Sequence, residues 1–242
     1  MARLVLLGTG TCQLEPDRAA SAVLVELAGS RFVFDFGPGV ARRLVGLGLQ
    51  QDDLGDIVLS HFHPDHLSDL VPFIHAGLYS PADTRRRSLS IHGPAGIVEV
   101  VETLLSIVGF PEAEEAPFRV VAREVEGWLQ IGDLSAVYSP LPPAGNHGLR
   151  FEHGGRTYAI TGDSHYHEAE IEFLRGLDLA IVDSGHLEDA ELVELAAHTG
   201  LEVLVCSHQY RSLDEEALNR GARERGYTGT IVVARDGMTF AL

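Results

Sequence analysis

Residues 60–69 read Ser60-His61-Phe62-His63-Pro64-Asp65-His66-Leu67-Ser68-Asp69, which places four side chains that commonly bind metal ions within six positions. The segment follows a short apolar run typical of a buried strand and precedes a stretch with helical periodicity. Along an extended chain, His61 and His63 lie on one side, whereas Asp65 and His66 begin the helix and can approach from another direction. A helix cap with surface histidines would not need three neighbouring imidazoles. Because imidazole and carboxylate together suit zinc, manganese or iron better than magnesium alone, the segment predicts a centre that can hold two such ions.

Short apolar runs bounded by glycine, proline or polar residues alternate with helical periodicity along the rest of the chain. Strands are expected at residues 5–7, 22–27, 31–35, 57–59, 134–138, 149–152, 157–160, 180–183, 203–206 and 231–234. Helices are expected at residues 40–47, 67–79, 97–108, 168–174, 189–198 and 214–225. No long linker or short repeat separates the two halves. The sequence therefore predicts one α/β domain over residues 1–242, with two sheets and helices outside.

The composition is that of a globular protein that works inside the cell. The hydrophobic share is 45% and the charged share is 22% of 242 residues, which excludes disordered and fibrous classes. No apolar run approaches the roughly 20 residues needed to cross a bilayer. Residues 1–8 have too short an apolar stretch for a signal peptide, and we expect a buried strand there. The two cysteines, Cys12 and Cys206, lie far apart in sequence, which favours the reducing cytoplasm.

The charge balance is strongly acidic. Eighteen basic residues, all arginine, stand against thirty-five acidic residues, and the formal net charge is −17. A field this negative repels long nucleic acids, which bind through neutralisation of their phosphates by basic side chains. The one basic cluster, Arg85-Arg86-Arg87, is too short to reverse that field and is expected to be a solvated loop.

The motif His-x-His-x-Asp-His after a short strand resembles the signature of the metallo-β-lactamase superfamily. Leu7-Gly8-Thr9-Gly10-Thr11 and Asp35-Phe36-Gly37-Pro38-Gly39 are similar to the opening of its ribonuclease Z-like branch, which includes tRNA 3′-processing nucleases and small phosphodiesterases. Gly162-Asp163-Ser164 resembles the Gly-Asp-Thr motif of that branch, and Ser207-His208 resembles the segment with its last ligand histidine. The resemblance extends from end to end of the chain. It implies an αββα sandwich of two mixed β-sheets flanked by helices.

Carried over residue by residue, the resemblance implies two divalent metal ions with zinc as the expected metal and manganese or iron as alternatives. One ion would be held by His61, His63 and a third histidine, and the other by Asp65, His66 and His208, with Asp163 between the two ions.

The third histidine is where this sequence departs from the family pattern. In the family it lies several residues before a Gly-aromatic-Arg strand, but here His147 comes directly before Gly148-Leu149-Arg150. No other histidine lies between His92 and His147, so His147 is the predicted ligand. Either the proline-rich loop at residues 140–146 re-aims His147, or this ligand is absent and one ion binds weakly.

The resemblance also implies roles for residues around the metal ions. Asp65 and His186 are the predicted catalytic residues, with His186 near the leaving group as the proton donor; the alternative for His186 is a helix-start residue bonded only to solvent. Asp35 is expected to steady the histidine loop by hydrogen bonding, and Asp69 to act likewise. A separate pair, His165 and His167, would form an outer rim of the site or cap the helix at residue 168.

A pair of divalent ions about 3.5–4 Å apart can share a hydroxide and aim it at an electrophile. Such a centre hydrolyses phosphate esters, lactones, thioesters or other carboxylic esters, and the branch favours a phosphodiester. Bacterial tRNA-processing members carry a long basic arm between the third histidine and the Gly-Asp-Thr motif, but only residues 148–162 separate His147 from Asp163. We therefore expect a small-molecule phosphodiester as substrate, no long nucleic acid, no membrane partner, and a homodimer as one candidate assembly.

Three alternatives to a small-molecule phosphodiesterase stay open at this point. They are a carboxylic ester, lactone or thioester hydrolase, a tRNA 3′-processing nuclease, and a non-catalytic metal-binding or sensing module. The irregular segment at His147 keeps the last alternative open, and the metal content of the protein would discriminate it from an enzyme.

Overall fold

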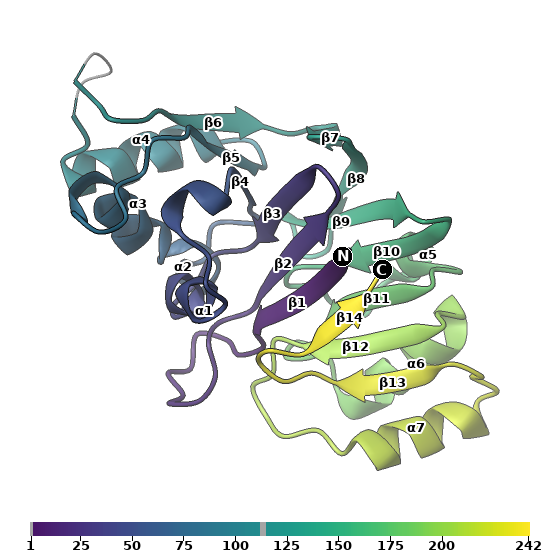
Figure 1. The fold of residues 1–242 in the computed structure, drawn as a ribbon. Helices are drawn as coiled ribbons and strands as arrows, with labels where there is room; N and C mark the ends of the chain where they lie inside the picture. Colours follow the sequence, from purple (N-terminus) through teal and green to yellow (C-terminus); the bar gives the residue numbers. More distant parts are fainter. Residues whose placement is uncertain (1, 112–114) are drawn as a thin grey trace.

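The computed structural model describes residues 2–111 and 115–242, and residue 1 of the expected N-terminal segment lies outside this part. Two seven-stranded sheets form its centre (Figure 1). The first sheet has the order β14 (Thr239–Ala241), β1 (Arg3–Gly8), β2 (Ala22–Leu27), β3 (Ser30–Phe34), β4 (Asp56–Val58), β5 (Leu89–Gly93), β6 (Val120–Glu124). The second has the order β13 (Thr230–Val233), β12 (Val203–Ser207), β11 (Leu179–Asp183), β10 (Arg156–Ile160), β9 (Asn146–His153), β8 (Leu134–Leu141), β7 (Gly127–Ile131).

Both sheets are mixed, as expected. The neighbours from β14 through β3 are antiparallel and those from β3 through β6 are parallel. The neighbours from β7 through β10 are likewise antiparallel and those from β10 through β13 are parallel. β14 pairs with β1, so the C-terminal end of the chain returns to its N-terminal end (Figure 1).

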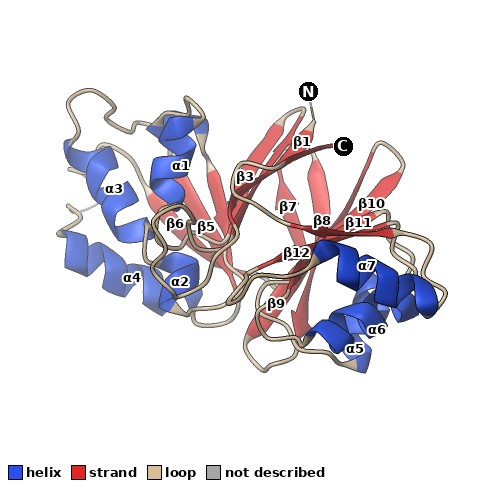
Figure 2. Ribbon diagram, turned by 90° about the horizontal axis from the view of Figure 1, so that it is seen from below, coloured by secondary structure: helices blue, strands red, loops and turns tan. Residues whose placement is uncertain are grey.

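Helices cover the outer faces of the two sheets, which gives the predicted αββα sandwich (Figure 2). The first sheet is covered by α1 (Val40–Gly46), α2 (Pro64–Leu67), α3 (Leu70–Tyr79) and α4 (Ile97–Val108), with a short 3₁₀ turn, η1, at Gln51–Asp53. The second sheet is covered by α5 (Glu168–Leu174), α6 (Asp189–Thr199) and α7 (Glu215–Glu224).

The alternation of side chains along the strands explains this layering. Leu4 and Leu6 of β1 face the core between the sheets, whereas Val5 and Leu7 face the helices. Because successive side chains of a strand point to opposite faces, a strand that is apolar at every position must be covered on both sides. The core between the sheets draws residues from both of them, including Phe34.

Three expectations about the elements were wrong in detail. The strands β5, β6, β7 and β14 were not predicted, and the helix expected at residues 67–79 is divided into α2 and α3 at Ser68–Asp69. The strand expected at residues 31–35 ends at Phe34, because Asp35 has a φ of 63°, in the left-handed region that a strand does not use.

The prediction that Arg85-Arg86-Arg87 is a solvated loop was wrong for its first residue. Arg85 is fully buried and donates hydrogen bonds to the carbonyl oxygens of Leu54 (2.7 Å), Arg87 (2.7 Å), Ser88 (2.9 Å) and Gln51. A guanidinium carries five donors in a fixed plane, so it can satisfy several carbonyls at once. The basic cluster therefore contributes even less positive surface than its sequence indicates.

Within the part of the chain that the structure describes, no helix is both long and apolar enough to cross a membrane.

Candidate metal centre

The loops that follow three strands converge at one end of the sandwich. The histidine loop, residues 59–63, follows β4 of the first sheet, and Asp163 and His208 follow β10 and β12 of the second. Pro64 is the first residue of α2, and its ring favours the extended conformation observed at His63. This change from extended chain to helix divides the motif, so that His61 approaches from the loop and Asp65 and His66 approach from the helix.

Five of the seven predicted ligands form one buried cluster. His66 Nε2 lies 2.9 Å from Asp163 Oδ1, and His208 Nε2 lies 3.2 Å from the same oxygen. The other oxygen of Asp163, Oδ2, lies 3.6 Å from His61 Nε2. Asp65 Oδ2 lies 3.5 Å from His208 Nε2. Asp163 thus presents one oxygen to each side of the cluster, as a bridging ligand would.

His63 lies at the exposed side of this cluster. Its ring stands edge-on to the ring of His61, with 4.5 Å between the centroids, whereas the ring of His61 lies 4.2 Å from that of His66. The motif therefore forms a continuous row of imidazoles from the surface inward.

The polar atoms of the cluster fit a metal ion. The Nε2 atoms of His61, His66 and His208 and Oδ1 of Asp163 are buried and have no hydrogen-bond partner. Buried polar atoms in folded proteins are nearly always satisfied, and cations held between these atoms would satisfy all four. The donor set, nitrogen with carboxylate oxygen, suits zinc, manganese or iron. These residues form a divalent metal site.

The charges in the cluster lead to the same conclusion. Burial and the neighbouring imidazole of His66 lower the pKa of His61 to about 4. Burial also opposes protonation of His208, but contacts with Asp183 and Asp65 outweigh it and raise its pKa to about 9. For Asp163, burial is outweighed by contact with His66, and its pKa falls below the ordinary value. The carboxylates that draw a proton onto His208 also attract a divalent cation, which binds in competition with that proton, and the low pKa of His61 keeps its imidazole in the neutral form that a metal ligand needs.

Asp35 holds the histidine loop in place, as predicted. Its Oδ1 accepts a hydrogen bond from the Ser60 N–H (2.7 Å), and its Oδ2 accepts one from His66 Nδ1 (2.8 Å) and one from the Ser60 hydroxyl (2.9 Å). By fixing Nδ1 as the donor, Asp35 leaves Nε2 of His66 free to bind metal. The next residues also support the motif, because a Cβ at Gly37 would overlap the carbonyl oxygen of Asp65.

Asp69 has a different role from the one predicted. Its Oδ2 accepts a hydrogen bond from the Ala41 N–H (3.0 Å) at the start of α1, so within the described part of the chain its side chain caps that helix and makes no hydrogen bond to the histidine loop.

Asp183, the last residue of β11, was not predicted and joins two parts of the centre. Its Oδ2 accepts hydrogen bonds from His186 Nδ1 (2.7 Å) and from the Ser164 N–H (3.0 Å), and its Oδ1 lies 3.4 Å from His208 Nδ1. The side chain is fully buried. Its only sequence signal was a carboxylate at the end of an apolar strand, three residues before a histidine.

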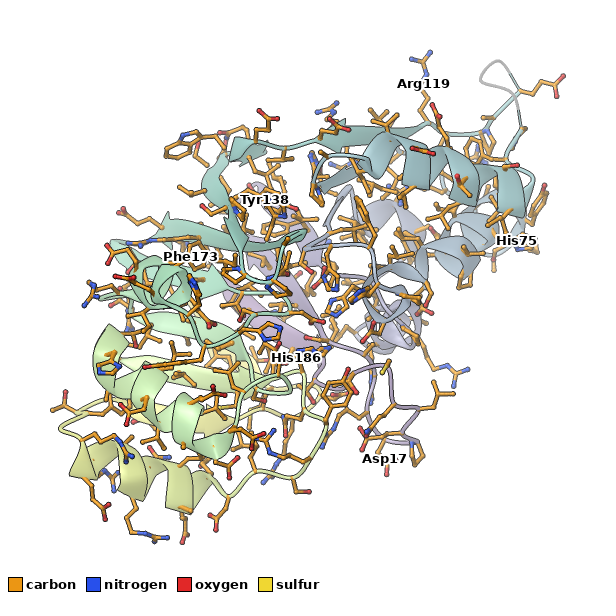
Figure 3. The ribbon with its side chains drawn as sticks, turned by 180° about the vertical axis from the view of Figure 1, so that it is seen from behind. Asp17, His75, Arg119, Tyr138, Phe173 and His186 are labelled. Carbon is orange, nitrogen blue, oxygen red and sulfur yellow. The ribbon has the colours of Figure 1, made fainter. Side chains whose placement is uncertain are left out.

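His186 (labelled in Figure 3) is exposed to solvent. Its ring lies 5.3 Å from that of the buried His208, so it stands at the solvent side of the cluster. The hydrogen bond from its Nδ1 to Asp183 raises its pKa above the ordinary value of histidine, although burial opposes this. Tyr210, which was also not predicted, stands edge-on to both rings, at 5.6 Å from His186 and 5.5 Å from His208.

His165 and His167 divide between the two expected roles. The ring of His165 lies 5.4 Å from that of His186, so His165 belongs to the rim of the site. His167 instead caps α5, because its Nδ1 accepts a hydrogen bond from the Ala169 N–H (3.0 Å).

His147 does not lie among the clustered ligands. It is the second residue of β9, its ring stacks on Tyr138, and its Nδ1 lies 3.3 Å from the carbonyl oxygen of Gly145. The other six predicted ligands therefore lie in or beside the cluster, and His147 has contacts of its own.

Comparison with known proteins gives one family. A family model described as a beta-lactamase superfamily domain matches residues 30–217. A ribonuclease Z of Mycolicibacterium gilvum is 29% identical over 181 residues, which cover 68% of this chain and 62% of that protein. A ribonuclease Z of Methanopyrus kandleri is 27% identical over 276 residues, which cover 96% of this chain and 95% of that protein.

Two solved structures share the fold. The metallo-β-lactamase fold protein YhfI of Bacillus subtilis superposes with a TM-score of 0.82 at 20% identity and covers 99% of this chain and 98% of its own. A diphosphatase of the PhnP family superposes with a TM-score of 0.70 at 20% identity and covers 100% of this chain and 98% of its own.

Proposed function

The chain belongs to the metallo-β-lactamase superfamily, in its ribonuclease Z-like branch, and from this premise we propose that it hydrolyses a small phosphodiester at a centre of two divalent metal ions. Membership makes it a metal-dependent hydrolase. The substrate class, the number of ions and a cytoplasmic location are parts of the proposal.

The residues divide into two sets around Asp163. In the proposal, His61 and His63 would hold one ion, and Asp65, His66 and His208 would hold the other; His61 Nε2 lies beside Oδ2 of Asp163, and the Nε2 atoms of His66 and His208 lie beside Oδ1. Ions bound there, with zinc as the expected metal, would supply an activated water and stabilise negative charge at the attacked phosphorus. The protein's own contribution is to fix two ligands of the same ion: Asp35 holds His66 through a hydrogen bond, and Asp183 lies 3.4 Å from His208 Nδ1.

His186 is the proposed proton donor to the departing oxygen. Its Nδ1 is held by Asp183, so its Nε2 is the nitrogen left for a substrate. Asp183 raises the pKa of His186 above its ordinary value, which favours the protonated form that a general acid requires. The side chain is about one-third exposed, so a substrate bound at the cluster can reach it.

The observation that carries the choice of a small substrate is the hairpin of β9 and β10. Gly154 and Gly155 alone connect the two strands, and Ile160 is followed within three residues by Asp163. This hairpin leaves no place for a basic arm between residues 147 and 163. The alignment with the Methanopyrus protein is longer than this chain, so that relative carries insertions that this chain lacks.

Charge supports the same choice. A surface with a net charge of −17 repels a polyanion, whereas a small phosphodiester has about one negative charge, which bound metal ions can neutralise. The likeness to a diphosphatase of the PhnP family, although it shows only the fold, agrees with a small phosphate-containing substrate.

Processing of tRNA 3′ ends is the second candidate, because the relatives are named ribonuclease Z. These names do not fit the expectation that long nucleic acid is excluded. Lactone, thioester and other carboxylic ester hydrolysis would use the same cluster, but no feature of the described rim favours those substrates.

Substrate choice is tested by assaying the zinc- or manganese-loaded protein with aryl phosphodiesters, cyclic nucleotides and precursor tRNA at two salt concentrations. The proposal predicts turnover of a small phosphodiester with a rate nearly independent of moderate salt. Lactones and thioesters serve as the control panel. Specific 3′-end cleavage of precursor tRNA, together with inertness toward every small phosphodiester, would transfer the assignment to the second candidate.

A further inference from the structure

His147 is held by contacts that leave it outside the metal cluster. In the pairing of β8 with β9, Tyr138 lies opposite Leu149 and Pro140 lies opposite His147. His147 is therefore the diagonal neighbour of Tyr138 on the same face of the sheet. Their rings are nearly parallel, with an interplanar angle of 7° and 4.6 Å between centroids.

The partner of His147 in this stack supports the start of the histidine loop. Tyr138 is fully buried, and its hydroxyl donates a hydrogen bond of 2.7 Å to the carbonyl oxygen of Leu59, two residues before His61. The backbone of Ser60 also faces the imidazole of His147. The stacked pair thus packs against the two residues from which His61 is presented.

The two sides of Asp163 are consequently unequal. On one side, three buried side chains, Asp65, His66 and His208, converge, and both imidazoles contact carboxylates through Nδ1. On the other side lies His61, whose ring is edge-on to the ring of the exposed His63. Among the described residues, the hydrogen-bond partner of His61 Nδ1 is the neutral hydroxyl of Ser60, at 2.9 Å. A carboxylate partner makes an imidazole a more basic ligand than a hydroxyl does.

We propose that His147 is a positioning residue and not a metal ligand, so that the position at His61 and His63 has one protein ligand fewer than the position at His66 and His208 and binds its ion more weakly. This inference rests on the proposed two-metal centre. It resolves the departure from the family pattern at the proline-rich loop: the register of β9 fixes His147 on Tyr138, and the loop does not re-aim it.

Zinc titration of the full-length, chelator-treated protein against a chromophoric zinc chelator tests this inference. The wild type should bind zinc in two steps whose dissociation constants differ by at least about tenfold. His147→Phe keeps a flat ring on Tyr138 without a nitrogen, so both steps should stay within about threefold of wild type. His147→Ala removes the stack and should weaken only the weaker step, with unchanged stoichiometry. The matched control His63→Ala removes a proposed ligand and should abolish the weaker step.

Loss of the weaker step in His147→Phe would overturn the inference, because a ligand cannot be replaced by an apolar ring. Equal affinities for the two ions in the wild type would also overturn it. Loss of a step in His165→Ala would do the same, since the rim histidine would then be the missing ligand. Because no substrate is present, two unequal steps in a protein that hydrolyses no phosphodiester would contradict only the proposed function.

Discussion

Replacement of Asp183 by asparagine tests how the centre moves a proton. The change keeps the size of a side chain that is fully buried, but it removes the carboxylate that accepts the 2.7 Å hydrogen bond from His186 Nδ1. The proposed donor would then lose its hydrogen bond to a charged partner and the negative charge that raises its pKa. His186→Gln is the matched variant, because it removes the imidazole and leaves Asp183 in place.

The expected size of the effect follows from that hydrogen bond. A hydrogen bond to a charged partner contributes about 1.5–3 kcal/mol, and each 1.36 kcal/mol corresponds to about tenfold in rate. The kcat of Asp183→Asn for a phosphodiester with a poor leaving group should therefore fall about 10- to 150-fold. A general acid works in its protonated form, so activity declines as pH rises through the pKa of His186. Without the carboxylate this pKa falls toward about 6.5, and the decline moves to lower pH.

The assay compares two leaving groups across pH with saturating zinc, because Asp183 also lies 3.4 Å from His208 Nδ1 and its loss can weaken metal binding. A nitrophenolate departs without a proton, so both variants should lose less than about tenfold with an activated aryl ester. An alkoxide needs the proton, and both variants should lose much more with an alkyl ester or nucleotide. An equal loss for both leaving groups, or an unshifted pH profile in Asp183→Asn, would refute the role of this pair.

Three further perturbations follow from the contacts of the site. Asp35→Asn should weaken zinc binding about 10- to 100-fold in a chelator competition, because an amide has no charge and only one acceptor oxygen for the three donors that Asp35 serves; wild-type affinity would contradict this role. Gly37→Ala should lower the free energy of unfolding by on the order of 3 kcal/mol in urea denaturation, because its Cβ would overlap the Asp65 carbonyl; a loss below about 1 kcal/mol would contradict that overlap. Burial raises the pKa of Glu170 from 4.5 to about 8 in the folded protein. Between these two pH values the carboxyl is ionised in the unfolded chain but protonated in the folded one, so the free energy of unfolding of the wild type should decline from about pH 4.5 to pH 8. Glu170→Gln should make the melting temperature depend less on pH over this range. The same pH dependence as in the wild type would contradict the assignment of the decline to Glu170.

The local pattern of the sequence was sufficient to predict the layers of the fold and most residues of the metal centre. Residues 3–7 and 203–206 are apolar at nearly every position, which only a strand covered on both faces explains. The spacing of the histidine motif likewise required His61 and His66 to approach from different directions. Two of the strands that were not predicted, β6 and β14, lack such an apolar run. They lie at the two edges of their sheet and carry polar residues, so pairing with the neighbouring strand, and not their own sequence, determines that they are strands.

Residues that depend on distant backbone contacts could not be predicted from the sequence. Arg85 is a charged side chain that is buried because carbonyl oxygens from several segments surround it, and its neighbours in sequence give no sign of this. Asp183 acquires its role only when β11 places its end beside His186 and His208. His147 was predicted as a ligand by its position in the chain, whereas the register of β9 with β8 determines its contacts.

The central claim is that the cluster around Asp163 is a metal centre that hydrolyses small phosphodiesters, and Asp163→Asn tests it most directly. We predict that the zinc-loaded wild type turns over an activated phosphodiester and that Asp163→Asn lowers kcat/KM by at least about 10²-fold. Its bound zinc, measured by elemental analysis, should fall in parallel, with little change in the melting temperature of the metal-free protein. Full activity in Asp163→Asn would contradict the claim, and so would a zinc-loaded wild type that turns over no small phosphodiester.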